Sequence, residues 1–158
     1  MSEFQPAHGY LPHAAPMVLI ERVIAVSEDS AHCQVMVNES SVLAPFLNQR
    51  GALPAWFGIE ILAQTIGVWS GWHGRQHQDE KPQPGMLLGG RGYRAAQAEF
   101  AAGILLDVEI TLLMRDGKVG SFEGTIRHGT ALLASGRLNT YQPEQEEFQQ
   151  LLTQGISG

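Results

Sequence analysis

The sequence is poor in cysteine and in basic residues. It has one cysteine among 158 residues, Cys33, which excludes an intrachain disulfide framework. Ten lysines and arginines stand against sixteen aspartates and glutamates, so the formal net charge is −6. General nucleic-acid binders carry a basic surface, so this balance argues against a nucleic-acid partner. No cysteines and histidines have the spacing of a zinc site. These absences predict a reduced, cytoplasmic protein without a bound metal.

Targeting and membrane signals are also missing. The first ten residues, MSEFQPAHGY, have neither a basic region nor an apolar core, so they do not form a signal peptide. The longest apolar stretch, from Pro54 to Gly74, contains Glu60 and Gln64. A carboxylate at the centre of a membrane span costs about 2.5–3.5 kcal/mol on insertion scales. We therefore expect a buried helix of a soluble protein and no membrane association.

The remaining composition is typical of one folded domain. Hydrophobic residues make up 44% of the chain and charged residues 16%, and the length predicts a single domain over residues 1–158. A helix is expected from Pro54 to about His73, with a short amphipathic helix over about 143–154. Hydrophobic patterning and turn signals predict six extended segments, at 17–27, 31–39, 86–100, 104–114, 119–128 and 131–141.

The long helix is unusually apolar. Glu60 is the only charged residue between Arg50 and Arg75, and apolar side chains surround the whole cylinder. A helix that is hydrophobic all round is expected to be buried all round. The glycines on roughly one of its faces, Gly67, Gly71 and Gly74, indicate that another backbone comes close. A curved antiparallel sheet wrapped around one central helix satisfies both observations.

Three segments carry a resemblance to a known family. Residues 11–23 (LPHAAPMVLIERV) and 54–64 (PAWFGIEILAQ) resemble the N-terminal signature and central helix of 3-hydroxyacyl-(acyl carrier protein) dehydratases. Residues 87–93 (LLGGRGY) are similar to the aryl-polyene-type branch of these enzymes. The resemblance covers about residues 11–142. It implies an α+β hotdog fold, a homodimer, and a thioester substrate carried on acyl carrier protein or coenzyme A.

Glu60 is the leading catalytic candidate. A lone carboxyl group on an apolar helix must be protonated, hydrogen-bonded or directed into a polar cavity, and desolvation favours its neutral form, as a general acid requires. The alternative is a solvent-exposed charge that complements the helix dipole. The resemblance places the family's catalytic acidic residue at this position. Gln64 lies one turn further on the same face, where it either orients Glu60 or serves as a satisfied core amide.

Two further parts of a dehydratase site have candidates. Free N–H groups around Ala55 and Trp56, at the expected helix start, form an oxyanion site or an ordinary solvated terminus. The resemblance implies that a backbone N–H just after the proline binds the thioester carbonyl. Well-known family members carry their catalytic histidine in a G-H-F-P loop, whereas residues 44–54 here contain no histidine. His13 is the replacement base we consider, and its alternative is a structural role at the entry to the first strand.

These residues predict dehydration of a carrier-bound 3-hydroxyacyl thioester to the trans-2-enoyl thioester. No metal or redox cofactor is expected, because the substrate travels on a phosphopantetheine arm and its thioester acidifies the α-carbon. Arg91 and Arg94 are candidates for binding an acidic carrier protein, with a solvated strand face as the alternative. The glycines of residues 89–92 indicate a strand passing close to the helix. Two other functions remain open: a thioesterase in which Glu60 activates water, and a non-catalytic acyl-binding subunit of a synthase.

Overall fold

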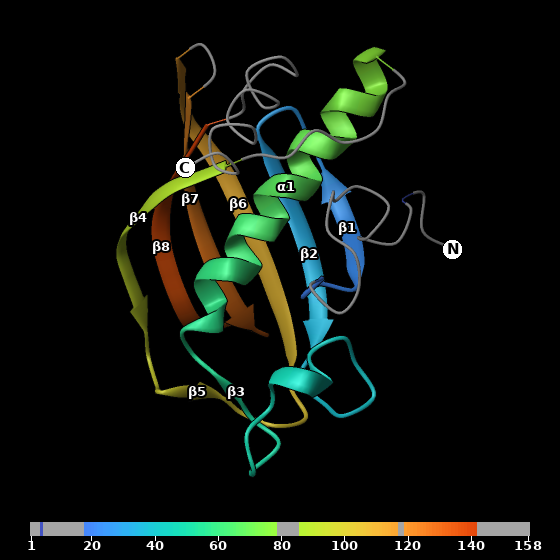
Figure 1. Ribbon diagram of the computed structural model, residues 1–158, viewed down its shortest axis with the longest axis vertical. Helices are drawn as coiled ribbons and strands as arrows, with labels where there is room; N and C mark the ends of the chain where they lie inside the picture. Colours follow the sequence, from blue (N-terminus) through green and yellow to red (C-terminus); the bar gives the residue numbers. More distant parts are fainter. Residues whose placement is uncertain (1–3, 5–17, 79–85, 117–118, 142–158) are drawn as a thin grey trace, which may run out of the picture.

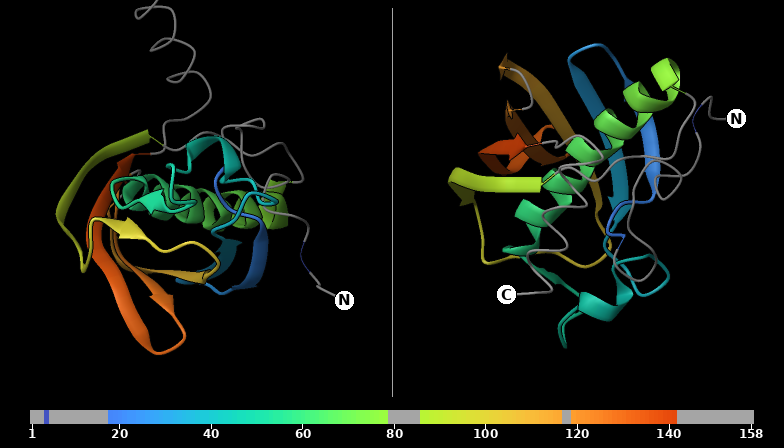
Figure 2. Two further views of the ribbon diagram at one scale, coloured as in Figure 1. Left: turned by 90° about the horizontal axis from the view of Figure 1, so that it is seen from below. Right: turned by 45° about the horizontal axis from the view of Figure 1, so that its top comes forward.

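A curved antiparallel sheet wraps around one long helix (Figures 1 and 2). The computed structural model describes residue 4 and residues 18–78, 86–116 and 119–141. Within these ranges the elements, in chain order, are β1 (Arg22–Val26), β2 (Ser30–Met36), a 3-10 turn (Ala44–Phe46), β3 (Leu53–Pro54), α1 (Phe57–Gln78), β4 (Met86–Ala95), β5 (Glu99–Phe100), β6 (Leu105–Asp116), β7 (Val119–His128) and β8 (Ala131–Tyr141).

Six strands form the main sheet in the order β1-β2-β6-β7-β8-β4, and every neighbouring pair is antiparallel. The helix lies between β3 and β4 in the sequence and packs across β2, β6 and β7. The short strands β3 and β5 form a separate two-stranded sheet at the end of the molecule where α1 begins (Figure 1). This arrangement places the start of α1 next to the small β3–β5 sheet.

Alternation of side chains explains why these segments form strands around a core. In β2, for example, Ala31, Cys33 and Val35 are buried while their neighbours are partly exposed. Such inward-facing residues meet the buried side of α1, which includes Ile61, Leu62, Ile66, Val68 and Trp69. Burial raises the pKa of Cys33 to about 12, so its thiol stays protonated and unreactive.

The helix begins later and ends later than predicted. It starts at Phe57 rather than Pro54, because Pro54 is still extended and pairs with Glu99 in the small sheet. It continues to Gln78, five residues beyond the predicted end at His73. No helix in the described part of the chain is long and apolar enough to cross a membrane.

The prediction that the helix is buried on every side is wrong for the single chain. Trp56, just before the helix, is 70% exposed, and Glu60 is also exposed. Ile59 and Ala63 are only partly buried. The sheet covers one side of α1 and leaves this apolar side open. The predicted helix over 143–154 lies outside the described residues.

Candidate functional site

The turn between β3 and α1 is held by hydrogen bonds on both sides of one residue, Ala55. Its N–H donates to the carbonyl of Ala98 at 2.9 Å, and its carbonyl accepts from the Gly58 N–H at 3.0 Å. The Tyr93 hydroxyl donates to the same carbonyl at 2.6 Å. The Ala55 N–H is therefore already used, which corrects the prediction that it belongs to the oxyanion site. Among the described residues, the Trp56 N–H has no acceptor, as is usual for donors at a helix start.

Glu60 and Gln64 meet one turn into the helix. The Gln64 Nε2 donates to Glu60 Oε1 at 3.3 Å, and Gln64 Oε1 accepts from the backbone N–H of Leu19 at 2.7 Å. Gln64 is only 2% exposed. Both interpretations of Gln64 thus describe the same side chain: it is a satisfied core amide and it contacts Glu60. Glu60 is exposed and lies in the first helical turn, where the dipole favours negative charge, so in the single chain it matches the solvent-exposed alternative and not a desolvated carboxyl group.

The spacing of these residues brings the candidate groups to one side of α1. Glu60 and Gln64 are four residues apart within α1, so they lie one turn apart on the same side, and Trp56 immediately precedes the helix. Both Trp56 and Glu60 are exposed in the single chain. The residue that carries the unused backbone donor and the residue that carries the carboxyl group therefore both lie at the surface near the start of α1.

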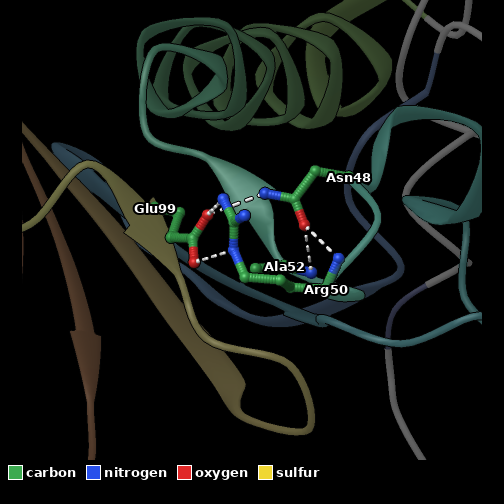
Figure 3. A network of polar contacts seen from close by, with 4 residues as sticks. All are labelled: Asn48, Arg50, Ala52 and Glu99. Carbon is green, nitrogen blue, oxygen red and sulfur yellow. Dashed lines mark hydrogen bonds and ion pairs between the residues drawn. The ribbon is translucent and has the colours of Figure 1, made fainter.

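The loop that precedes β3 is fixed by a polar network that the sequence analysis missed (Figure 3). Asn48 Oδ1 accepts from the N–H groups of Arg50 at 2.9 Å and Ala52 at 3.1 Å. Asn48 Nδ2 donates to Glu99 Oε2 at 2.7 Å. Arg50 binds both oxygens of Glu99, at 3.0 and 2.7 Å. Hydrogen bonds from Arg50 and then Asn48 hold the pKa of Glu99 below its usual range.

This network occupies the segment in which the resembling dehydratases carry their loop histidine. Asparagine followed closely by glycine is a turn signal, so Asn48 and Gly51 were recognisable as a turn. Nothing local indicates Glu99, which lies 51 residues from Asn48. The network connects the loop to β5 and so supports the β3–β5 pair that leads into α1.

The remaining predicted residues are His13, Arg91 and Arg94. His13 lies outside the described residues. On β4, Arg94 is exposed and the side chain of Arg91 is not described. The register places Arg91 opposite Arg137 of β8, an exposed arginine that the sequence analysis missed. A cavity of about 320 Å³ is lined here by Gly92, Glu123, Ser135, Gly136 and Arg137.

Two different structural requirements explain the glycines at positions 90 and 92 of β4. A Cβ on Gly90 would lie 3.9 Å from the Ile59 side chain, which agrees with the predicted approach of this strand to the helix. Gly92 instead has a positive φ of 61° within an irregular stretch between Arg91 and Arg94. That conformation favours glycine because a Cβ would be strained there.

Comparisons with known proteins find related dehydratases. The family model described as ApeP-like, ApeP dehydratase, matches residues 5–153. A chain in the dehydratase heterocomplex ApeI:P from Xenorhabdus doucetiae is 53% identical, with a TM-score of 0.87 over 95% of this chain and 99% of that chain. The 3-hydroxyacyl-acyl-carrier-protein dehydratase FabZ of Streptococcus pneumoniae strain Hungary19A-6 is 28% identical over 142 residues, covering 87% of this chain and 96% of FabZ.

A more distant structure shares the fold alone. The uncharacterized protein PH1136 from Pyrococcus horikoshii is 13% identical, with a TM-score of 0.63 over 90% of this chain and 97% of that chain. The predicted α+β hotdog architecture, with its antiparallel sheet around one helix, is confirmed.

Proposed function

The chain belongs to the ApeP-like dehydratase family, and we propose that the N-terminal end of its helix α1 eliminates water from a carrier-bound 3-hydroxyacyl thioester. Family membership and the FabZ relatives confirm the predicted class, a hydro-lyase acting in fatty-acid or polyene-type synthesis. The observation that carries the assignment of the site is the exposed carboxyl group of Glu60 four residues after Trp56, whose N–H has no acceptor among the described residues.

The Trp56 N–H is the proposed donor to the thioester carbonyl. Removing a proton from C2 moves negative charge onto this oxygen, so a donor held in place beforehand stabilises the transition state more than the ground state. The positive end of the α1 dipole acts in the same direction. The Ala55 N–H takes no part, since the Ala98 carbonyl already accepts its hydrogen bond.

Glu60 is the proposed acid for the leaving hydroxyl group. With His13 as base, the neutral imidazole takes the C2 proton, the C3–O bond breaks, and protonated Glu60 completes the departing water. The proton on His13 then returns to Glu60 before the next turnover. In the one-base alternative, the Glu60 carboxylate takes the C2 proton and the same carboxyl group gives it to the hydroxyl as water leaves. Both routes yield the trans-2-enoyl thioester and one water molecule.

A Glu60→Gln variant tests whether Glu60 transfers a proton in the reaction. It keeps the shape and the contact with Gln64 but cannot transfer the proton, so turnover should fall by at least about 100-fold. The assay is mass spectrometry of a 3-hydroxyacyl thioester on carrier protein, with Glu109→Gln on the exposed sheet surface as the matched control. Release of free thiol would indicate the thioesterase instead. Binding without either product would indicate a non-catalytic subunit.

The proposed reaction needs no metal or redox cofactor, because the thioester itself acidifies the C2 proton. The rate of water loss should therefore be the same before and after dialysis against a chelator. A loss of activity that returns on adding a divalent cation would contradict this part of the proposal.

A second dehydratase subunit is the proposed partner for the open side of α1. Trp56 is 70% exposed there, far more than a large aromatic side chain usually is. Strand β4 is also an edge of the sheet, so one side of it has no neighbouring strand among the described residues. The solved relative belongs to a dehydratase heterocomplex, whereas the resemblance to the dehydratase family implies a homodimer. Native mass spectrometry of the chain alone, and mixed with a second dehydratase, distinguishes the two assemblies.

The arginines of β4 and β8 are the proposed docking site for an acidic carrier protein. Arg94 and Arg137 are exposed, and the register places Arg91 beside Arg137. Reversing the charge of Arg94 and Arg137 together should raise the KM for carrier-linked substrate without changing that for a short pantetheine thioester. An unchanged KM for both substrates would place the docking site elsewhere.

A further inference from the structure

Tyr93 reaches from the sheet to the turn that begins the helix. Its hydroxyl donates to the Ala55 carbonyl at 2.6 Å, across 38 residues of sequence. The side chain is half-buried, and burial raises its pKa to about 12, so the phenol remains a protonated donor at neutral pH. The contact joins β4 to the candidate oxyanion site.

Three glycines leave room for this contact. A Cβ on Gly58 would overlap the Tyr93 hydroxyl, and a Cβ on Gly136 would lie 3.2 Å from the Tyr93 Cα. Gly92, directly before Tyr93, has the positive φ of the irregular stretch in β4. Bulges of this kind turn a side chain in a new direction. The backbone of α1, β4 and β8 therefore leaves space for the Tyr93 hydroxyl beside Ala55.

The peptide group between Ala55 and Trp56 transmits the effect of this hydrogen bond. Its carbonyl and its N–H lie in one plane and point in opposite directions. The carbonyl is held by two donors, Tyr93 Oη and the Gly58 N–H. Fixing the carbonyl therefore fixes the direction of the Trp56 N–H. A hydrogen bond to the carbonyl also polarises the peptide group, which strengthens its N–H as a donor.

We propose that Tyr93 is a positioning residue for the dehydration, because its hydroxyl holds the Ala55–Trp56 peptide group with the Trp56 N–H directed at the thioester carbonyl. This inference rests on the proposed function, in which that N–H is the oxyanion donor. Tyr93 itself does not touch the substrate. Its role differs from that of Glu60, which transfers a proton.

The geometry is tested without any turnover by NMR of protein labelled with ¹⁵N only in tryptophan. The chain has three tryptophans, so three backbone amide signals are expected, and the Trp56 signal is assigned with Trp56→Phe. In Tyr93→Phe the Trp56 amide should move upfield and exchange faster with solvent, while the Trp69 and Trp72 amides stay in place. Tyr141→Phe, at the far end of β8, is the matched control. An unmoved Trp56 signal in Tyr93→Phe would overturn the proposal.

Steady-state kinetics then measure the effect on the reaction. Each variant is assayed in the same subunit composition as the active wild-type assembly. Loss of a direct oxyanion donor costs about 10²–10³ in kcat, so the indirect loss in Tyr93→Phe should be smaller, about tenfold, with KM unchanged within about twofold. Gly58→Ala, which displaces the hydroxyl, should show the same split between kcat and KM. Unchanged kcat in Tyr93→Phe, with active wild-type protein, would overturn only the role of Tyr93. A wild-type assembly that releases no water would overturn the proposed function together with it.

Discussion

Gln64 links the candidate acid to the buried interior through one amide group. Its Oε1 accepts the Leu19 N–H and its Nε2 donates to Glu60. Gln64→Leu leaves that buried N–H without its acceptor, so we expect a loss of about 1–3 kcal/mol in the free energy of unfolding. Urea denaturation measures it, with Gln97→Leu at an exposed position as the control. Equal stability of both variants would show that the amide contributes nothing to the fold.

The phenol of Tyr93 should make the free energy of unfolding depend on pH in the alkaline range. Burial raises its pKa from 10.0 to about 12, so the folded chain holds this proton more tightly than the unfolded chain. Its contribution to stability is complete below the unfolded pKa and is lost as the pH rises through the folded pKa. The free energy of unfolding should therefore fall between about pH 9 and 12, and it should fall less in Tyr93→Phe. Parallel curves for the two proteins would contradict this account.

At the scale of elements, the helix packs tightly against β7. A Cβ added to Gly124 would lie 2.6 Å from Leu62 Cδ2, and Leu62 is fully buried. Gly124→Ala should therefore cost about 1–3 kcal/mol through overpacking. Gly90→Ala is the matched control, because the nearest atoms that its Cβ would meet among the described residues lie at 3.9 Å. Thermal unfolding of the two variants checks the difference, and equal transition temperatures would show that the core adapts at Gly124.

We expect the loop before β3 to depend more on Asn48 than on Arg50 for its stability. Asn48→Ala removes the acceptor of two backbone N–H groups and a donor to Glu99, so we expect a loss of about 1–2 kcal/mol in the free energy of unfolding. Arg50→Ala removes an ion pair in which 71% of the arginine side chain is exposed, which should change stability less. Chemical denaturation ranks the two variants. The reverse order would show that the ion pair, rather than the turn, holds the loop.

Local pattern predicts most of the elements, and long-range contacts account for the errors. Turn signals and apolar alternation located β6, β7 and β8 within two residues of their observed ends. The helix start was misplaced because Ala55 is held by Ala98, a contact that no local pattern encodes. For the site, helical spacing sufficed to pair Glu60 with Gln64. The sequence did not indicate the role of Tyr93, because its hydrogen-bond partner, Ala55, lies 38 residues away.

At the scale of the whole molecule, the open side of α1 accounts for the assembly we propose. Large aromatic residues contribute strongly to binding when they are buried at an interface. Trp56→Ala keeps the backbone N–H but should weaken subunit association by at least tenfold, as measured by analytical ultracentrifugation. Leu132→Ala is the control, because Leu132 is another exposed large apolar residue and belongs to β8 instead of the start of α1. Equal association of both variants would place the interface on another surface.

The proposed function depends above all on proton transfer by Glu60 during water loss at the start of α1. The most direct test follows a 3-hydroxyacyl thioester on carrier protein by mass spectrometry, with wild-type protein and Glu60→Gln in the same subunit assembly. We predict that the wild-type protein forms the enoyl thioester and that the variant, folded and assembled, loses at least about 99% of this activity. A variant that releases water at the wild-type rate would remove Glu60 from the reaction and contradict the proposed site.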